Sequence, residues 1–143
     1  KLAYVAEMGG NRIHVINLED FSVTYIPIGS NPRAIVLSPD NTKMYVTMNL
    51  SGKVASWDLV ANMAGKSVRT GEAARSLAIS SDGSTMFVVN FKSNTMSKVR
   101  TSDMKVLETI KACNEPIGIT YDTPTGNTWV ACYKGQIKIY SNN

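Results

Sequence analysis

The sequence repeats itself about every 42 residues. The segments AYVAE, MYVTM, MFVVN and TWVAC carry an aromatic residue at the same place, and Tyr4, Tyr45, Phe87 and Trp129 are 41, 42 and 42 positions apart. Flanking segments recur with them: SNPRAIVLSPDN at 30–41 returns as EAARSLAISSDG at 72–83, and more loosely as NEPIGITYDTPT at 114–125. Self-similarity at this period predicts a row of similar structural units.

Each unit has the pattern of four short strands. In the second unit, residues 33–38 alternate apolar and small residues, and SPDN supplies turn chemistry before the strand-like KMYVTM at 43–48. KVASWDL at 53–59 and GKSVRT at 65–70 complete the unit. Turn signals every 8–12 residues fit an antiparallel meander, and no stretch shows a 3.6-residue apolar period. With a repeat of this length, the pattern predicts an all-β β-propeller of four-stranded antiparallel blades.

The phase of the repeat leaves the two terminal blades incomplete. With the strands named A to D from the propeller centre outward, the chain reads BCD, ABCD, ABCD, ABC, with units near 1–31, 32–73, 74–115 and 116–143 of a single domain. Propellers usually close with four to eight blades, which protects their strand edges. We therefore expect these 3.5 units to be part of a larger ring. The alternative is a ring completed by self-association of copies through the incomplete blades.

Composition sets broad limits on function. The hydrophobic fraction of 43% and charged fraction of 18% are ordinary for a soluble globular domain. No run of about 18 apolar residues is present, so we expect no membrane span. A formal net charge of +4 suits an anionic partner without requiring one.

The charges are expected to segregate onto opposite faces of the disc. Because strand direction alternates, the B–C and D–A connections share one face, and the A–B and C–D connections share the other. The first, which we call the basic face, should carry more basic than acidic residues. Its acidic residues are Glu7, Glu72 and Glu115, and its basic residues are Arg12, Arg33, Lys53, Arg75, Lys92, Lys111 and Lys134. The second, the acidic face, should carry more acidic than basic residues. Its basic residues are Lys43 and Lys105, and its acidic residues are Glu19, Asp20, Asp40, Asp82, Asp103 and Asp122.

Arg33 and Arg75 occupy the same place in successive units, at the start of the inner strand. Two guanidinium groups converging there could hold a carboxylate or phosphate through bidentate hydrogen bonds. The alternative is that each arginine pairs with a backbone carbonyl or with an acid of a neighbouring blade, for which Glu72 and Glu115 are the candidates. Both interpretations stay open at this point.

Two aromatic residues, Phe91 and Tyr133, follow equivalent strand ends and are each followed by a lysine, Lys92 and Lys134. Exposed rings that stack on bases, next to cations that contact phosphates, are typical of nucleic-acid-binding surfaces. The alternative is that both rings pack against the adjacent blade.

Cysteine, histidine and motif content argue against catalysis and metal binding. Cys113 and Cys132 fall in the same final unit and could form a disulfide, or remain two separate thiols. The one histidine, His14, is three units away along the chain and has no evident carboxylate partner, so we expect a structural role for it and no metal site. No nucleophile elbow, phosphate-binding loop or metalloprotease motif occurs. We expect no enzymatic activity and no cofactor.

The unit PRAIVLSPDNTKMYVTM followed by GKVASWDL resembles the YVTN-repeat propellers, the YncE-like family. The matching residues are Pro32, Ser38, Pro39, Asp40, Tyr45, Val46, Thr47, Trp57, Asp58, Ser81, Asp82, Gly83 and Asn90. Met48 and Cys132 replace the asparagine of the motif, and Arg100 replaces its aspartate. The resemblance implies a secreted, periplasmic or surface protein that binds or scaffolds. Such repeats are also found joined to cell-envelope enzymes, including capsule and polyglutamate-synthesis proteins.

Taken together, these features predict a non-catalytic binding or scaffold propeller outside the cytoplasm. Its basic face would contact an anionic partner, either an acidic polymer or an acidic protein surface. The first alternative is the binding or sensory part of a larger cell-envelope enzyme. The second alternative is a nucleic-acid-binding propeller.

Overall fold

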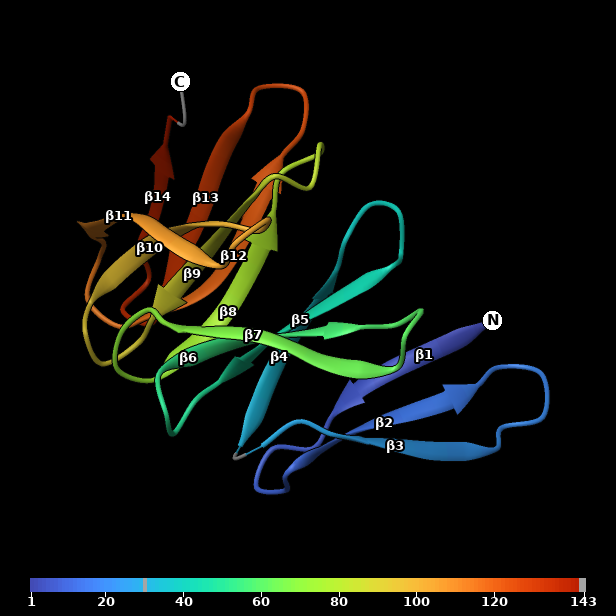
Figure 1. The fold of residues 1–143 in the computed structure, drawn as a ribbon. Helices are drawn as coiled ribbons and strands as arrows, with labels where there is room; N and C mark the ends of the chain where they lie inside the picture. Colours follow the sequence, from blue (N-terminus) through green and yellow to red (C-terminus); the bar gives the residue numbers. More distant parts are fainter. Residues whose placement is uncertain (30, 142–143) are drawn as a thin grey trace.

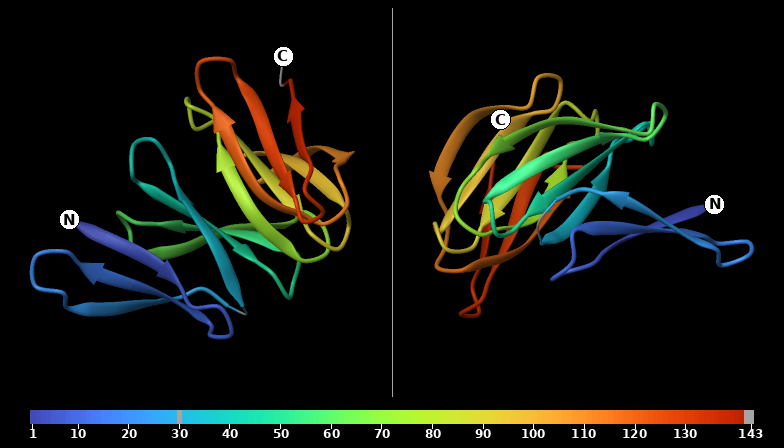
Figure 2. Two further views of the ribbon diagram at one scale, coloured as in Figure 1. Left: turned by 180° about the vertical axis from the view of Figure 1, so that it is seen from behind. Right: turned by 60° about the horizontal axis from the view of Figure 1, so that its bottom comes forward.

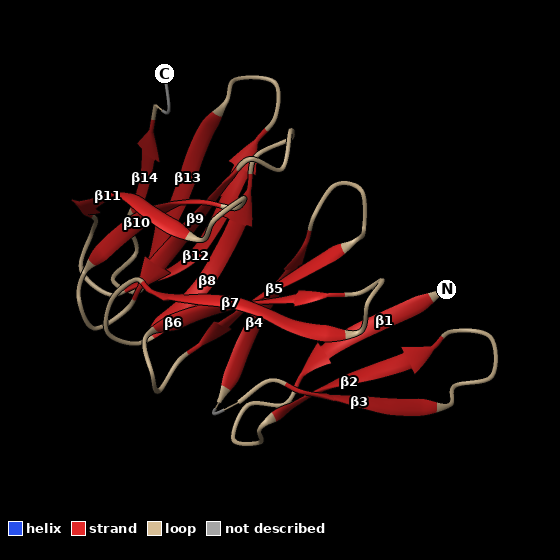
Figure 3. Ribbon diagram, viewed as in Figure 1, coloured by secondary structure: helices blue, strands red, loops and turns tan. Residues whose placement is uncertain are grey.

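The computed structural model describes residues 1–29 and 31–141, and within them all regular secondary structure is β-strand (Figures 1 and 3). The strands form four antiparallel sheets. Their bounds are β1 (Leu2–Ala6), β2 (Arg12–Asn17) and β3 (Val23–Pro27) in the first sheet; β4 (Pro32–Leu37), β5 (Lys43–Met48), β6 (Lys53–Asp58) and β7 (Met63–Arg69) in the second; β8 (Ala74–Ile79), β9 (Thr85–Asn90), β10 (Thr95–Arg100) and β11 (Lys105–Lys111) in the third; and β12 (Pro116–Asp122), β13 (Asn127–Cys132) and β14 (Ile137–Tyr140) in the fourth. In the described residues no helix is long and apolar enough to cross a membrane.

Each sheet is a simple meander in which consecutive strands are neighbours. The four sheets stand side by side in a row, with the sheet of β1 at one end and the sheet of β14 at the other (Figures 1 and 2). The first strands β4, β8 and β12 contact one another in sequence and form the inner edge. The predicted strand order BCD, ABCD, ABCD, ABC and the all-β propeller class are therefore confirmed.

The hydrophobic core lies between the sheets. The second strands β5 and β9 are buried on both faces beyond their first residue, which explains why KMYVTM and TMFVVN are nearly continuous apolar runs. The outer strands β7 and β11 are mostly exposed. Tyr45 fills the space between the second and third sheets, and Phe87 fills the space between the third and fourth.

Trp129 differs from the other recurring aromatic residues. Tyr45 and Phe87, at the equivalent positions, are buried, yet 39% of the Trp129 surface is exposed. Its side chain lies on the face of the fourth sheet that is turned away from the third sheet, because Val130, its neighbour along β13, belongs to the core between those sheets. The described residues place no further sheet against that face.

Equivalent turns after β4 and β8 use aspartate in the expected way. The Asp40 carboxylate accepts hydrogen bonds from the backbone N–H of Thr42 (3.1 Å) and from the Ser38 hydroxyl, and the Asp82 carboxylate accepts the same pair from Ser84 (3.0 Å) and Ser80. These contacts fix an Asx-type turn between two antiparallel strands. Both aspartates therefore act in hairpin formation, at the face opposite the basic residues.

Candidate functional site

The B–C and D–A connections meet on one face, where backbone hydrogen bonds tie them together. The N–H groups of Asn49, Phe91 and Tyr133 donate to the carbonyl oxygens of Asn31, Ala73 and Glu115 at 3.1, 3.0 and 2.9 Å. Each bond joins the loop between the second and third strands of a blade to the loop that enters the same blade. The main chain thus holds the basic face in a fixed form in three successive sheets.

Two arginines and three partners lie on this face, and we call them the arginine–aromatic cluster. Arg33 is the second residue of β4, and its Nη1 donates to Met8 Sδ at 3.2 Å. Arg75 is the second residue of β8, and its Cζ lies 4.8 Å from the centre of the Phe91 ring. Phe91 in turn meets Tyr133 edge to face, with ring centres 6.4 Å apart. The four sheets thus each contribute to one surface.

Neither cluster arginine is neutralised by an acid of the residues that the structure describes. In the described part of the chain no carboxylate oxygen lies within 4 Å of Arg33 or Arg75. Glu72 and Glu115, the candidate partners, donate their backbone N–H groups to Ser93 Oγ and Asn94 Oδ1, both at 2.7 Å. The pairing with these acids that was considered from the sequence is therefore not the observed arrangement.

The two guanidinium groups are close enough to affect each other. Partial burial and the positive charge of Arg33 lower the pKa of Arg75. Lowering by a like charge means that the charged form of Arg75 is disfavoured by its neighbour. An anion placed between the two guanidinium groups would attract both of them, so their electrostatic interaction would become favourable and both charges would be stabilised.

Arg12, also predicted as a contact residue, is in a different situation. Its Nε is 2.6 Å from Glu7 Oε2, and its guanidinium lies 4.7 Å from the centre of the Tyr25 ring. The same Glu7 oxygen is 2.9 Å from His14 Nε2. Hydrogen bonds from Arg12 and His14 lower the pKa of Glu7. The positive charge of Arg12 is therefore already matched by a carboxylate.

The expectation that His14 lacks a carboxylate partner is wrong. Val5 pairs with His14 across β1 and β2, and residues two apart along a strand share a face. Glu7, two residues after Val5, therefore reaches the same side as His14. The alternation of side chains along the two strands of this hairpin could have predicted the Glu7–His14 pair from the sequence.

The four lysines of the predicted site, Lys53, Lys92, Lys111 and Lys134, are exposed. Within the described residues none of them has a carboxylate partner within 4 Å. Arg69, which was not singled out from the sequence, also ends its strand on this face and donates to the Ser51 carbonyl at 3.0 Å. Its position at the end of an outer strand could have placed Arg69 on the basic face from the sequence.

Cys113 and Cys132 form a disulfide in the last sheet, with Cα atoms 6.0 Å apart. Cys113 lies just before β12 and Cys132 ends β13, at the side of the sheet that carries Tyr133. Both residues are buried in the core between the third and fourth sheets. No group of three or more His, Cys, Asp or Glu that could hold a metal ion occurs in residues 1–29 and 31–141.

Solved structures share this architecture. The chain superposes on hydrazine synthase of Kuenenia stuttgartiensis with a TM-score of 0.91 and 17% identity, covering 98% of this chain and 42% of that chain. It superposes on dihydro-heme d1 dehydrogenase NirN, solved in complex with DHE, with a TM-score of 0.75 and 19% identity, covering 98% and 35%. No family model matches the sequence, and no curated protein matches it. The fold and these likenesses define the chain as a β-propeller, and it spans less than half the length of either similar chain.

Proposed function

We propose that this propeller is a non-catalytic binding module whose basic face contacts an anionic partner, either an acidic polymer or an acidic protein surface. The observation that carries the proposal is the pair Arg33 and Arg75, which stand at equivalent positions of β4 and β8 and have no carboxylate within 4 Å among the described residues. A carboxylate bridging two guanidinium groups forms charge-assisted, bidentate hydrogen bonds and removes their repulsion.

The aromatic part of the cluster supports the same function. Stacking on Phe91 restricts the Arg75 side chain, and Tyr133 supports Phe91 from the next sheet. A long side chain that is already ordered loses less conformational entropy on binding. The four exposed lysines around the cluster would attract an extended polyanion over a wider area and speed its association.

The disulfide and the repeat motif support a location outside the cytoplasm and a relationship to the YVTN-repeat propellers. Disulfides persist mainly in oxidising compartments, such as the periplasm, the cell surface and the extracellular space. The Ser-Pro-Asp and Ser-Asp-Gly turns that carry the family resemblance form equivalent Asx-type turns. The proposed partner would then be a component of the cell envelope.

A second candidate function is the binding part of a larger enzyme, such as one that builds an envelope polymer. The observation that favours it is that both structural neighbours named above are enzymes, in which this chain covers only 42% and 35% of the length. At 17% and 19% identity the likeness concerns the fold, so the activities of those proteins are not transferred to this chain. In this candidate the basic face would hold an acidic substrate or product near a catalytic domain.

Isothermal titration with poly-γ-glutamate tests the proposal. We expect Arg33→Ala/Arg75→Ala to weaken binding by about tenfold or more, because a hydrogen bond to a charged group contributes about 1.5–3 kcal/mol. The matched control is Lys43→Ala/Lys105→Ala, which removes the same charge from the opposite face and should change the affinity less than about twofold. Equal losses in the two variants would show that only net charge matters and would reject the site.

Two further arms sharpen the result. Arg33→Lys/Arg75→Lys keeps the charge but loses the planar guanidinium group, so intermediate affinity is expected if the arginines form bidentate contacts.

Titration with a single-stranded oligonucleotide tests nucleic acid as the partner. Tighter binding to the oligonucleotide than to poly-γ-glutamate, with a steep salt dependence that Tyr133→Ala reduces, would favour the nucleic-acid alternative instead.

A further inference from the structure

Arg33 and Arg75 both stand in β-bulges near the start of an inner strand. Between β4 and β5 the register shifts so that two residues, Arg33 and Ala34, lie opposite the single residue Thr47. Between β8 and β9 the register shifts in the same way at Arg75. A bulge interrupts the hydrogen bonds of the ladder and changes the direction in which a side chain points. The main-chain groups at a bulge therefore need other partners.

The Thr47 hydroxyl supplies such a partner at the first bulge. Thr47 is fully buried, and its Oγ1 accepts a hydrogen bond from the Ala34 N–H at 3.0 Å. The same hydroxyl donates to the carbonyl oxygen of Arg75 at 2.9 Å. One side chain of the second sheet thus joins the peptide bond between Arg33 and Ala34 to the main chain of Arg75 in the third sheet.

Asn49, which follows β5, makes a second contact of the same kind. Its Nδ2 donates to the carbonyl oxygen of Ala74 at 3.2 Å, and its N–H donates to that of Asn31 at 3.1 Å. Two consecutive carbonyl groups of β8, those of Ala74 and Arg75, are therefore held by side chains of the second sheet. The strand that carries Arg75 is fixed against the blade that carries the other arginine.

The bulge does not itself require the hydroxyl. A bulge recurs in the fourth sheet at Ile117, the residue equivalent to the two arginines. The positions equivalent to Thr47 in the third and fourth sheets hold Val89 and Ala131, whose side chains form no hydrogen bonds. The threonine thus stands at the junction where two arginines are neighbours, and valine takes its place where an arginine is next to an isoleucine.

We propose that Thr47 is a positioning residue of the basic face, whose buried hydroxyl holds the strands of Arg33 and Arg75 at one fixed separation. The inference rests on the proposed function, because this separation affects binding when one anionic group contacts both guanidinium groups. Donors that are already in place lose less free energy to rearrangement when the ligand arrives. Thr47 acts through the main chain and does not touch the ligand.

A double-mutant cycle, measured by isothermal titration with poly-γ-glutamate, tests this role. Thr47→Val keeps the branched shape but lacks the hydroxyl, and valine already stands at the equivalent position 89. We expect it to weaken binding by about threefold to tenfold in the wild-type background and by less than about twofold in the Arg75→Ala background, where no pair is left to align. Thr47→Ser should recover most of the lost affinity. Thr47→Ala is a second variant without the hydroxyl and should behave like Thr47→Val.

Thr101→Val is the matched control for the loss of a buried hydroxyl. Thr101 is buried, and its Oγ1 donates to the Gly83 carbonyl at 2.7 Å on the acidic face. Because the same kind of hydrogen bond is removed, this variant should lower Tm about as much as Thr47→Val. Its affinity for poly-γ-glutamate should change less than about twofold, since the arginines are not involved.

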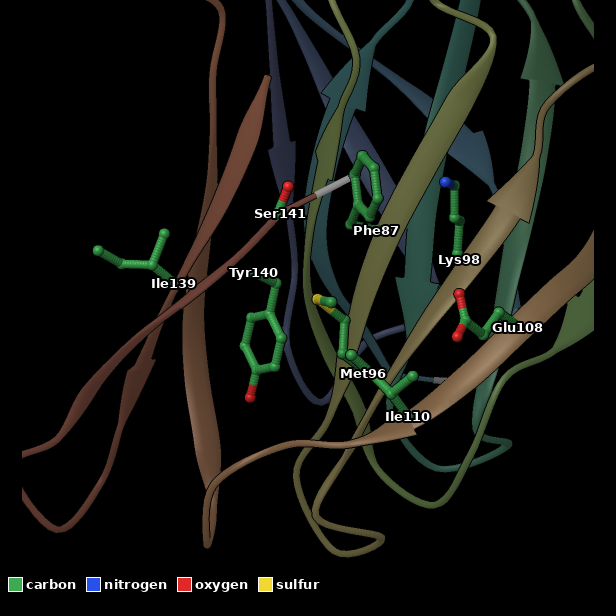
Figure 4. Close-up of a pocket in the computed structure, with 8 residues that line it drawn as sticks. All are labelled: Phe87, Met96, Lys98, Glu108, Ile110, Ile139, Tyr140 and Ser141. Carbon is green, nitrogen blue, oxygen red and sulfur yellow. The ribbon is translucent and has the colours of Figure 1, made fainter. Parts of the chain in front are cut away.

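Lys98→Ala controls for binding at another place. A cavity of about 430 Å³ lies between β14 and the third sheet, with Lys98 and Glu108 at one end (Figure 4). We expect Lys98→Ala to leave the affinity nearly unchanged, because this cavity contains no residue of the arginine–aromatic cluster. A loss as large as that of Thr47→Val would locate the polymer at the cavity and overturn the proposal.

NMR signals of the arginine Nε–H groups give a readout that needs no ligand. In the free protein, Thr47→Val should shift the signals of both Arg33 and Arg75, and Thr101→Val should shift neither. If the wild type did not bind poly-γ-glutamate, the proposed function would fail, while the shifted arginine signals would still support the positioning role. Binding that Thr47→Val leaves unchanged, or weakens equally in both backgrounds, would overturn the positioning role and leave the proposed function intact.

Discussion

The two faces of the propeller use their charges in different ways. On the acidic face, carboxylates bind groups that are close to them in the sequence. Asp40 and Asp82 accept hydrogen bonds from their own turns, and Asp103 pairs with Arg100 at 2.7 Å. On the basic face, Arg33 and Arg75 meet a thioether and an aromatic ring instead of an acid. These three aspartates act in hairpins, whereas Arg33 and Arg75 have no carboxylate within 4 Å in residues 1–29 and 31–141. Charge that the fold does not use is the better guide to a binding surface.

The largest expected effect concerns the covalent link on the basic side of the fourth sheet. Replacing Cys113 and Cys132 by serine should lower the free energy of unfolding by about 3 kcal/mol, because the crosslink closes a 19-residue separation and restricts the unfolded chain. Denaturant titration of the oxidised protein, the reduced protein and the double variant measures this. Reduced wild type should match the variant, and equal stability with and without the link would contradict its role.

Lowering the pH should destabilise the protein through the carboxylates of the acidic face. Hydrogen bonds from Ser80 and Ser84 lower the pKa of Asp82 from 3.8 to about 2, and Arg100 lowers that of Asp103 to about 2. Because these folded-state values are depressed, the carboxylates stabilise the protein above pH 3.8, and this contribution is lost as pH falls toward 2. Thermal unfolding followed from pH 5 to pH 2 should therefore show a steep decline.

Asp82→Asn keeps a side-chain oxygen for the turn but removes the titrating charge, so the decline should become shallower. Glu72→Gln on the basic face is the matched control, since no basic side chain lies within 4 Å of Glu72 in the described residues. The same pH dependence in wild type and Asp82→Asn would show that the acidic face does not use this charge as described.

The smallest effect tests the repulsion within the arginine–aromatic cluster. Without a bound anion, Arg33→Gln should raise stability by about 0.5 kcal/mol or less at low ionic strength, since it removes a like charge from Arg75. The gain should vanish at high salt, where exposed charges are screened. Thermal unfolding at two salt concentrations measures this, and a loss of stability at low salt would mean that Arg33 is favourably paired after all.

Much of the architecture could be read from the sequence because its signals are local and repeated. The apolar run in KMYVTM and the aspartate turns are each complete within a short stretch, and both recur with the 42-residue spacing, so the strand order was predictable. Contacts between sheets were less accessible. Whether Arg75 meets Glu115 or Phe91 depends on sheet twist and side-chain rotamers, which a repeat pattern does not encode. The partner of His14 was within reach, because Glu7 shares a face of one hairpin with it.

The backbone bonds of Asn49, Phe91 and Tyr133 to the loops that enter their blades have an evolutionary consequence. Met8 occupies the corresponding place in the first unit, so four different side chains stand at one repeat position. Because the main chain secures the loop in the last three of these units, the side chain there is free to vary without disturbing the fold. A substitution at this repeat position can therefore change the side chain that the basic face presents while the loop that carries it keeps its main-chain hydrogen bond.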